Sequence, residues 1–379
     1  MLRTVGQKLL HLVPVLFLVS LATFFMLELI PGDPAAVILG PDGTPEQYAQ
    51  LRDEMGLDEP VLERYVSWLG DTVRGDLGRS LVPPVQDVRE MIQSRLPVTL
   101  ELAALAIVMS LALAVPVALY AAYRAGYRFD RTANSFAFGA ISVPSFLAAL
   151  LLVFFLVFHP DIVRWLALIA GLGLTAWLAQ RALRLAQEYP AGQGRTRYLA
   201  LGLGGALLVL LVTLFLWGNW PEFPRQGFVR LTSDEGIWAN LRHAFLPALT
   251  LALTEAAVFM RLLRSDLIST LQDDFILSAK AKGMPVWRIL VRDALRPSSF
   301  SLITVAGVAL GRLIGGTVIV ETIFNLPGMG TMIVDAIGAH DFRVVQAGVL
   351  VIAVFYVTLN AIIDISYAYL DPRIRRGRV

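Results

Sequence analysis

Long apolar runs separated by polar segments constrain this chain more than any other feature of its sequence. A run of about 20 apolar residues is long enough to cross the hydrocarbon core of a bilayer as a helix. The chain is 56% hydrophobic and only 16% charged, with a mean hydropathy of +0.65, which exceeds what a soluble domain needs. We therefore expect an all-α, polytopic membrane protein with spans at residues 9–30, 98–122, 134–158, 163–180, 198–218, 244–263, 298–322 and 343–369.

The first 30 residues have a basic start and an apolar run, as a secretory signal peptide has. The run is too long for a signal peptide and no small-residue cleavage site follows, so we expect residues 1–30 to form a retained transmembrane helix. Residues 31–97 are polar and rich in Pro and Gly. They predict a lobe outside the membrane, with short helices at Pro45–Met55 and Pro60–Val73.

The distribution of Lys and Arg predicts the direction of the spans. With the N-terminus inside, the segments on the cytoplasmic side carry about twice as many Lys and Arg as those on the other side. The lobe should then lie outside, and both termini and residues 266–297 should lie in the cytoplasm. The span at 163–180 is the shortest, and an interfacial helix pair is its alternative.

Residues 266–297 form the longest polar interruption between apolar runs in the second half of the chain. Ile268, Leu271 and Phe275 recur at helical spacing, and the small Ser278 and Ala279 continue that face. A break at Gly283 and a proline at position 285 then suit the first turn of a second helix. The apolar face expected for that helix consists of Trp287, Leu290, Val291 and Ala294, and a basic face consists of Arg288, Arg292 and Arg296.

The pattern therefore predicts two short helices with a junction at Lys280–Gly283, lying beside the membrane. Two functions suit such a segment. It is either a basic loop on anionic lipid headgroups or a docking element for a partner protein.

Several functional classes find no support in the sequence. None of the lysines, Lys8, Lys280 and Lys282, belongs to a phosphate-binding loop, so any ATPase must be another chain. There is no cysteine, the four histidines lack metal-ligand spacing, and no HExxH or GxSxG motif is present. The chain is therefore not expected to be an enzyme or to hold a cofactor or metal of its own.

An ion-coupled secondary transporter or channel usually carries ionisable residues deep in its helices. Glu28, Glu321 and Asp364 lie near span ends, where they are expected to face water or to cap a turn. Glu255 and Arg312 lie near mid-span, and one acid and one base are thin support for a proton relay. A self-sufficient transporter or channel, and a scaffold without a transport role, stay as alternatives.

A ridge of glycines surrounds Arg312. Gly307, Gly311 and Gly315 are four residues apart, so they share one helix face that another backbone can approach closely. The approaching helix belongs either to this chain or to a second subunit. Together with Glu255 and Arg312, these glycines are our candidates for a translocation pathway or a helix-packing seam.

Four motifs in order resemble the permease subunits of ABC importers for dipeptides, oligopeptides and nickel. They cover nearly the whole chain apart from about 159–221. The motifs are Pro31-Gly-Asp-Pro-Ala35; Gly56-Leu-Asp-Glu-Pro60 with Arg95-Leu-Pro-Val-Thr-Leu-Glu101; Ala279-Lys-Ala-Lys-Gly283 with Arg292-Asp-Ala-Leu-Arg-Pro297; and Glu321-Thr-Ile-Phe-Asn-Leu-Pro-Gly-Met-Gly330 with Leu370-Asp-Pro-Arg-Ile-Arg375.

The resemblance implies a type I ABC importer permease fold with a core of six helices. It also implies several partners: a second homologous permease, two cytoplasmic ATPases that bind ATP and Mg, an extracytoplasmic substrate-binding protein and a peptide substrate. No nucleic acid is implied. The segment 266–297 is similar to the family's cytoplasmic "EAA" loop, which docks in a groove of the ATPase. The ATPase-coupling residues so implied are Leu277, Ser278, Ala279, Lys280, Ala281, Lys282, Gly283, Arg288 and Arg292.

Two features depart from the family pattern. The glutamate of the "EAA" triplet is absent, because Leu277-Ser278-Ala279 stands at that position, which leaves the coupling contact open but not the role. Residues 159–221 are expected to form an inserted helical hairpin that adds about two spans to the usual six. The hairpin follows residues 98–158, which hold the second and third spans, and precedes the core at 222–379. A lipid-facing addition is the simplest interpretation of this hairpin, and a regulatory or partner-binding element is the alternative.

Overall fold

The computed structural model describes residues 2–28, 33–40, 43–188 and 193–370. Every regular element among them is a helix, and one isolated antiparallel bridge joins Arg79 and Asp87. The predicted all-α class is therefore confirmed for the part of the chain that is described. The C-terminal motif after Leu370 lies outside it.

The described chain divides into two compact units. One comprises the described residues of Met1–Leu147 and Gln226–Val379, and the other comprises those of Ala148–Arg225. The second unit contains the segment 159–221 that departs from the family pattern.

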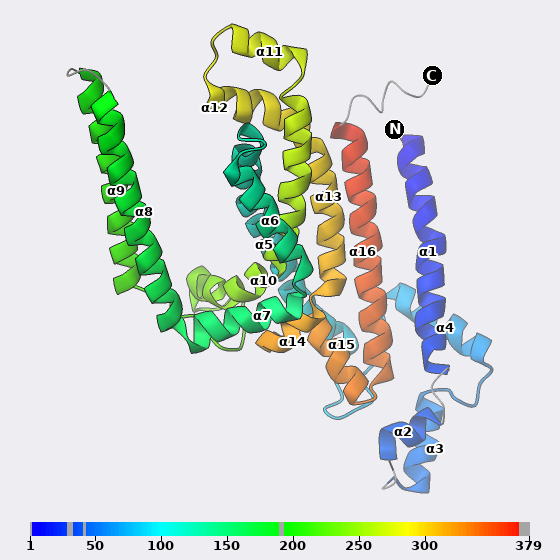
Figure 1. Cartoon of the computed structure of the whole chain (residues 1–379). Helices are drawn as coiled ribbons and strands as arrows, with labels where there is room; N and C mark the ends of the chain where they lie inside the picture. Colours follow the sequence, from blue (N-terminus) through cyan, green and yellow to red (C-terminus); the bar gives the residue numbers. More distant parts are fainter. Residues whose placement is uncertain (1, 29–32, 41–42, 189–192, 371–379) are drawn as a thin grey trace. The chain divides into compact units, whose positions relative to one another are not determined.

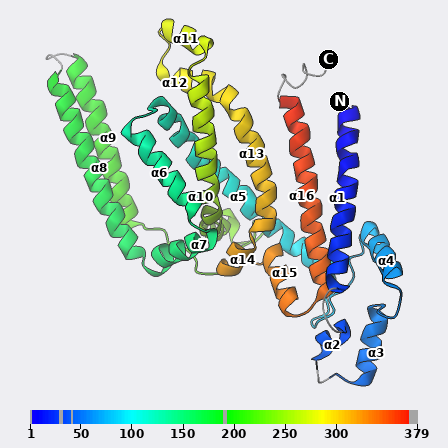
Figure 2. The same cartoon turned by 45° about the vertical axis from the view of Figure 1, so that its right-hand side comes forward.

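The first unit is a bundle of long helices (Figures 1 and 2). Its long helices are α1 (Leu2–Glu28), α5 (Val88–Tyr123), α6 (Arg128–Ser142), α10 (Gly236–Thr270), α13 (Leu295–Gly316) and α16 (Phe342–Leu370). The most extensive packing is between α5 and α10, α6 and α13 also contact α10, and α16 contacts both α13 and α1. Small buried side chains such as Ala106 and Ala114 on α5 and Ala252 on α10 let these helices approach closely.

Six helices within the described residues are long and apolar enough to cross a membrane, and the number is up to eight if each of two bent pairs counts as one span. The six include α5, α10, α13 and α16 of the first unit. The first predicted span corresponds to α1, whose apolar part, Leu12–Phe25, is shorter than these six.

The predicted third span, 134–158, is not one continuous helix. Its first part, α6, ends at Ser142, and Val143 is extended with φ −85° and ψ 121°. The chain resumes as α7 (Ser145–Val153) and the π-helical η2 (Phe154–Phe158). The cause is Pro144, whose ring disfavours helical backbone at the residue before it.

The predicted span 298–322 also ends early. After Gly316 the chain forms α14 (Val318–Phe324) and α15 (Met329–Gly338), a pair bent by 83°. Asn325 ends α14 in the left-handed region, at φ 49°. The apolar composition of this region gave no sign of a turn. The sequence pattern therefore predicted a straight span where the structure has a bent pair of short helices.

The lobe carries α2 (Pro34–Leu39), α3 (Pro45–Glu54) and α4 (Val61–Arg74). Both short helices predicted here are confirmed, and α3 begins with a capping box. The last ten residues of the predicted lobe already belong to α5, which begins at Val88 behind the N-cap residue Asp87.

Two contacts attach the lobe to the bundle. The first is an aromatic cluster: the ring centroid of Phe24 on α1 lies 5.4 Å from that of Tyr65 and 5.5 Å from that of Trp68. The hydroxyl groups of Tyr65 and Ser20 are also hydrogen-bonded, at 2.8 Å. The second is Asp341, at the start of α16, which is buried and accepts a hydrogen bond from Ser80 of the lobe. The lobe is therefore fixed to α1 and α16.

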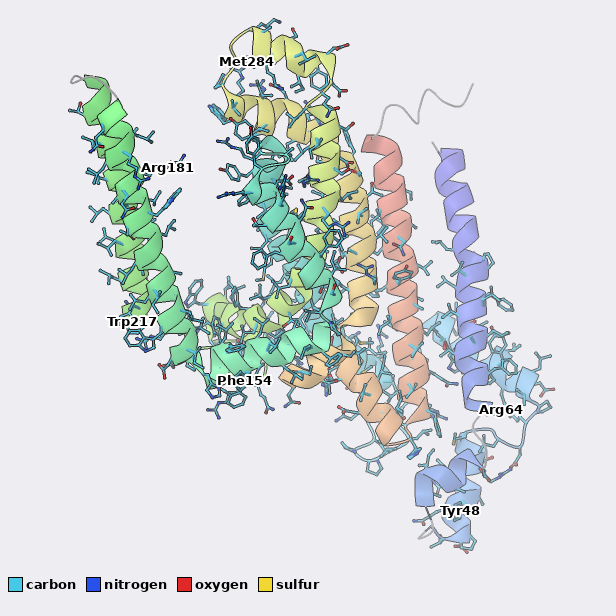
Figure 3. All side chains as sticks on the ribbon, viewed as in Figure 1. Tyr48, Arg64, Phe154, Arg181, Trp217 and Met284 are labelled. Atoms are coloured by element: carbon cyan, nitrogen blue, oxygen red, sulfur yellow. The ribbon has the colours of Figure 1, made fainter. Side chains whose placement is uncertain are left out.

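The second unit is a helical hairpin of α8 (Pro160–Glu188) and α9 (Gln193–Gly218), with Arg181 and Trp217 labelled in Figure 3. A Cβ at Gly171 would overlap Thr213, and one at Gly202 would overlap Ala182, so glycines permit the close contact of the two helices. Both are among the six candidate spans, which are defined by length and composition, so the interfacial helix pair stays an alternative. Most of their large apolar side chains are exposed.

Candidate functional site

One end of the first unit carries the segment that the sequence singled out (Figure 1). It contains α11 (Asp274–Ala281), α12 (Val286–Arg288) and the π-helical η3 (Ile289–Ala294), which leads into α13. The two short helices with a junction between them are thus present, as predicted.

A Schellman motif forms the junction. The N–H of Gly283 donates to the carbonyl of Lys280 at 3.0 Å, and that of Met284 donates to the carbonyl of Ala279 at 3.2 Å. The φ of Gly283 is +70°, a region that glycine enters without steric cost. Met284 lies in the turn between α11 and α12 (Figure 3). Pro285 then precedes α12, so the glycine and the proline together set the direction of the second helix.

One face of this segment is anchored in the bundle. Ile276, Ile289 and Ala294 are buried in the same core cluster as Phe259 and Leu263 of α10. The anchoring residues come from α11 and η3, on both sides of the junction. The segment is therefore held by the bundle at two points.

Hydroxyl groups clamp the end of the segment to α10. Ser298 Oγ donates to Thr270 Oγ1 at 3.0 Å, and Ser301 donates to Asp266. Because α10 precedes the segment and α13 follows it, these bonds close the loop at its base. A force on the loop is therefore passed to both long helices.

The exposed surface of the segment carries five large apolar side chains. We name it the exposed loop face and define it by Phe275, Leu277, Val286, Trp287 and Val291. Their exposed fractions are 49%, 52%, 46%, 69% and 52% in that order. Large apolar side chains that stay exposed on one short segment make that segment a candidate interaction site.

Eight of the nine predicted coupling residues are exposed, and Ala279 is buried. The predicted faces are partly wrong. A turn at residues 271–273 separates Ile268 from α11, so that Ile276 rather than Phe275 is buried. In the second helix the π-helical stretch changes the number of residues per turn, so Ala294 is buried while Trp287 is exposed.

An ion pair braces α6 against α10 near this loop. Arg264 Nη2 donates to Asp130 Oδ2 at 2.7 Å, and its Nε donates to Oδ1. The backbone N–H of Gly126 donates to the same carboxylate at 2.8 Å. One turn earlier on α10, the guanidinium carbon of Arg261 lies 4.0 Å from the centroid of the Phe138 ring. Neither interaction was predicted from the sequence.

The acid and the base predicted near mid-span form a pair. Arg312 Nη2 on α13 lies 2.7 Å from Glu255 Oε1 and 3.0 Å from Oε2 on α10. The exposed fraction of the side chain is 6% for Glu255 and 65% for Arg312. The acid is therefore inside the bundle, whereas the base extends from it.

The glycine ridge packs against α16 of the same chain. A Cβ at Gly307 would lie 2.9 Å from Ile363, and one at Gly311 would lie 3.2 Å from Tyr356. Of the two partners predicted for the ridge, the described residues favour a helix of this subunit. Gly315, at the end of the ridge, is exposed.

Glu321 is a buried site that the sequence reasoning missed. Its exposed fraction is 0%. Its Oε1 accepts hydrogen bonds from Thr99 Oγ1 at 2.7 Å and Thr317 Oγ1 at 2.8 Å, and its Oε2 accepts one from the Thr331 N–H at 3.1 Å. The carboxylate therefore joins α5, α14 and the N-terminus of α15, where the helix dipole favours a negative charge. Of the two predicted roles, capping a turn is right and facing water is wrong.

Two glycines make room for this carboxylate. A Cβ at Gly328 would overlap it, and one at Gly330 would lie 2.8 Å from Oε2. The sequence signal was the pair of glycines shortly after an acid in an apolar run.

The side chains of Glu28 and Asp364 lie outside what the structure describes. Among the residues described, no cluster of three His, Asp or Glu side chains has the arrangement of a metal site.

Comparison with known proteins gives two matches to family models. Residues 114–376 match the family described as the binding-protein-dependent transport system inner membrane component, and residues 1–103 match the corresponding N-terminal family. The two matches together cover nearly the whole chain.

Relatives with assigned names cover the chain as fully. A dipeptide transport system permease protein of Escherichia coli is 30% identical over 379 residues, covering 100% of both chains. A putative peptide transport system permease protein of Brucella abortus is 32% identical over 363 residues, covering 96% of each chain. A probable peptide ABC transporter permease protein of Sinorhizobium fredii is 29% identical over 369 residues, covering 97% of this chain and 98% of that one.

Proposed function

The chain belongs to the family of binding-protein-dependent transport system inner membrane components, and on that premise we propose that it is the permease subunit of an ATP-driven importer that moves peptides across the cytoplasmic membrane. Relatives described as dipeptide and peptide transport permeases support the choice of substrate. The chain itself hydrolyses nothing in this proposal. Partner ATPase chains bind ATP and Mg and drive transport.

The observation that carries the proposal is the exposed loop face. Five exposed apolar groups held on a loop that is anchored in the bundle suit the surface of a protein partner. Exposed cations such as Lys280 and Lys282 provide a polar rim for such a contact. We infer that an ATPase subunit covers this face.

The anchoring of the loop supports a role in alternating access. Because Ile276 and Ile289 are buried in the bundle and the base is clamped at Thr270, closure of the ATPases would pull on α10 and α13 together. The bundle would then switch the side to which its pathway opens. A second, homologous permease completes that pathway in this proposal.

The orientation follows from the proposed docking. The loop and both termini lie in the cytoplasm, as the excess of basic residues on that side predicts. The lobe lies outside, where it offers a surface for the substrate-binding protein. Its surface carries Arg52, whose pKa is raised above its ordinary value by the hydrogen bond to Asp58 and then by that to Asp33.

The docking surface is tested by adding charge to it. Leu277→Asp combined with Trp287→Asp is expected to prevent the ATPase chains from co-purifying with the permease, because a carboxylate would be buried without a partner. Val73→Asp is the matched control, since Val73 is 79% exposed on α4 of the lobe. The control should retain the ATPases and peptide-stimulated ATP hydrolysis in the reconstituted complex. Full ATPase binding by the double variant would refute the docking assignment.

The α8–α9 hairpin is proposed as a peripheral, lipid-facing addition. Its helices expose most of their apolar side chains, and the segment closes on itself, since the Arg225 guanidinium carbon lies 5.2 Å from the Phe158 ring centroid. Replacing residues 160–220 by a short Gly/Ser linker should therefore leave peptide uptake at the level of the unaltered protein, per amount of protein in the membrane. Loss of uptake by a correctly inserted deletion variant would assign the hairpin a regulatory or partner-binding role instead.

A further inference from the structure

Arg312 holds a charged group at the depth of the membrane spans. It forms an ion pair with Glu255 of α10. At the α-helical rise of about 1.5 Å per residue, Glu255 lies about 28 Å from the first residue of α10 and about 22 Å from the last. The pair is therefore near the middle of that helix. The Arg312 side chain is 65% exposed.

A guanidinium at this depth is unfavourable in contact with hydrocarbon. Residues with such a charge face a water-filled space or polar groups of a partner. The exposed side of Arg312 therefore points away from lipid in the assembled transporter. This assigns the surface of α13 around Arg312 to the interior of the complex.

The guanidinium has unused donors on that side. Both contacts to Glu255 come from Nη2, at 2.7 Å and 3.0 Å, and within the described residues Nη1 and Nε make no hydrogen bond. The Nε and Nη1 donors are thus available to a second acceptor, and a charge-assisted hydrogen bond from arginine to a carboxylate is a strong one.

There is also room for a ligand beside the guanidinium. Gly315 and Gly316, one turn along α13, are exposed, and a Cβ at Gly316 would meet no atom within 4 Å. Val308, one turn in the other direction, is 46% exposed. The exposed positions one turn from Arg312 on α13 are thus apolar or lack a side chain.

We propose that Arg312 binds the C-terminal carboxylate of the peptide in transit, with Glu255 as the residue that positions the guanidinium. The proposal rests on the peptide-import function proposed above. Because Glu255 already neutralises the cation, the attraction to a second carboxylate is moderate, and a transport pathway needs binding weak enough for release. An acidic side chain of the second permease is the competing occupant.

The test removes both charges at once, because Arg312→Gln alone would leave Glu255 buried without its partner. The reconstituted transporter with the Glu255→Gln, Arg312→Gln double variant is compared with the unaltered one. Each is given a peptide with a free C-terminal carboxylate and the same peptide as a C-terminal amide. The preference for the free carboxylate is expected to fall about tenfold, as loss of one charge-assisted hydrogen bond implies. Arg184→Gln, an exposed arginine of the hairpin, is the control and should keep the original preference.

A second measurement does not depend on the amide being accepted by the binding protein. The chain has no cysteine, so Val308→Cys introduces a single thiol near Arg312. Under a copper–phenanthroline oxidant, a dipeptide with cysteine at its C-terminal position should form a disulfide with this thiol several-fold faster than one with cysteine at its N-terminal position. The difference should disappear in the charge-free double variant.

Three results have distinct meanings. An unchanged carboxylate preference together with equal crosslinking of the two dipeptides overturns the proposal. Failure of the double variant to co-purify with the second permease also overturns it, because Arg312 would then pair with that subunit. If the unaltered complex imports no peptide at all, the proposed function itself is wrong.

Discussion

Replacing Gly283 by tryptophan is expected to abolish peptide uptake while the protein stays folded in the membrane. Gly283 occupies the left-handed position of the Schellman motif at φ +70°, and a Cβ there would meet no atom within 4 Å. The indole would therefore project from the junction of α11 and α12, where we propose that an ATPase subunit docks. The measurement is uptake by membrane vesicles, with the amount of inserted protein determined by immunoblotting.

Gly283→Ala is the matched control for this change. It introduces the same backbone strain, about 1 to 2 kcal/mol for a non-glycine residue in the left-handed region, but adds no bulk. We expect it to retain most of the uptake, because its methyl group enters open space. Equal loss in both variants would show that the backbone and not the surface is responsible. Uptake that survives Gly283→Trp would show that the junction does not contact an ATPase.

Glu321→Ala is expected to destabilise the protein by about 3 to 5 kcal/mol and to stop transport. The change removes the acceptor of three hydrogen bonds in a fully buried site, and each unsatisfied buried donor costs about 1 to 3 kcal/mol. It also leaves a cavity beside Gly328 and Gly330. The bent α14–α15 pair would lose one of two hydrogen bonds to Thr99 of α5 and would keep the one that the Met329 N–H donates to Thr99 Oγ1 at 2.9 Å. A lowered midpoint of thermal unfolding in detergent and faster proteolysis of this pair would measure the effect.

Glu321→Gln keeps the shape of the side chain and one oxygen acceptor. That oxygen can still accept from Thr99 and Thr317, whereas the amide nitrogen would face the Thr331 N–H, so that one hydrogen bond is lost. Its effect should therefore be a fraction of that of Glu321→Ala. If both variants are as stable as the unaltered protein, the carboxylate does not stabilise the bent α14–α15 pair.

Local patterns predicted the features that depend on neighbouring residues. Gly283 and Pro285 predicted the junction between α11 and α12, and the Schellman motif shows why, since both residues act through their own backbone. The lobe helices α3 and α4 were predicted as well, and a proline stands at or next to the start of each. The existence of the core spans followed from the length of the apolar runs.

Sequence patterns did not predict burial or turns correctly where packing against a distant part of the chain determines them. Phe275 and Ile276 are adjacent apolar residues, and only the packing of α11 into the core cluster buries the second and leaves the first exposed. The bent pair α14–α15 was not predicted, because an apolar run does not reveal a turn. Glu321, which stabilises this pair, has one of its hydrogen-bond partners on α5, 222 residues away in the chain.

The sequence by itself determined that this chain is an all-α membrane protein with a polar segment between two apolar runs and an acid and a base near mid-span. Length, hydropathy and backbone preference decide these properties, and each is encoded within a few residues. Only the tertiary structure decided that Arg312 extends from the bundle while Glu255 is enclosed. It also decided that the glycine ridge meets α16 and that one face of the segment of residues 266–297 is anchored while the other is open. These properties depend on which helices pack together, and pairings between distant segments leave no periodic signal in a single sequence.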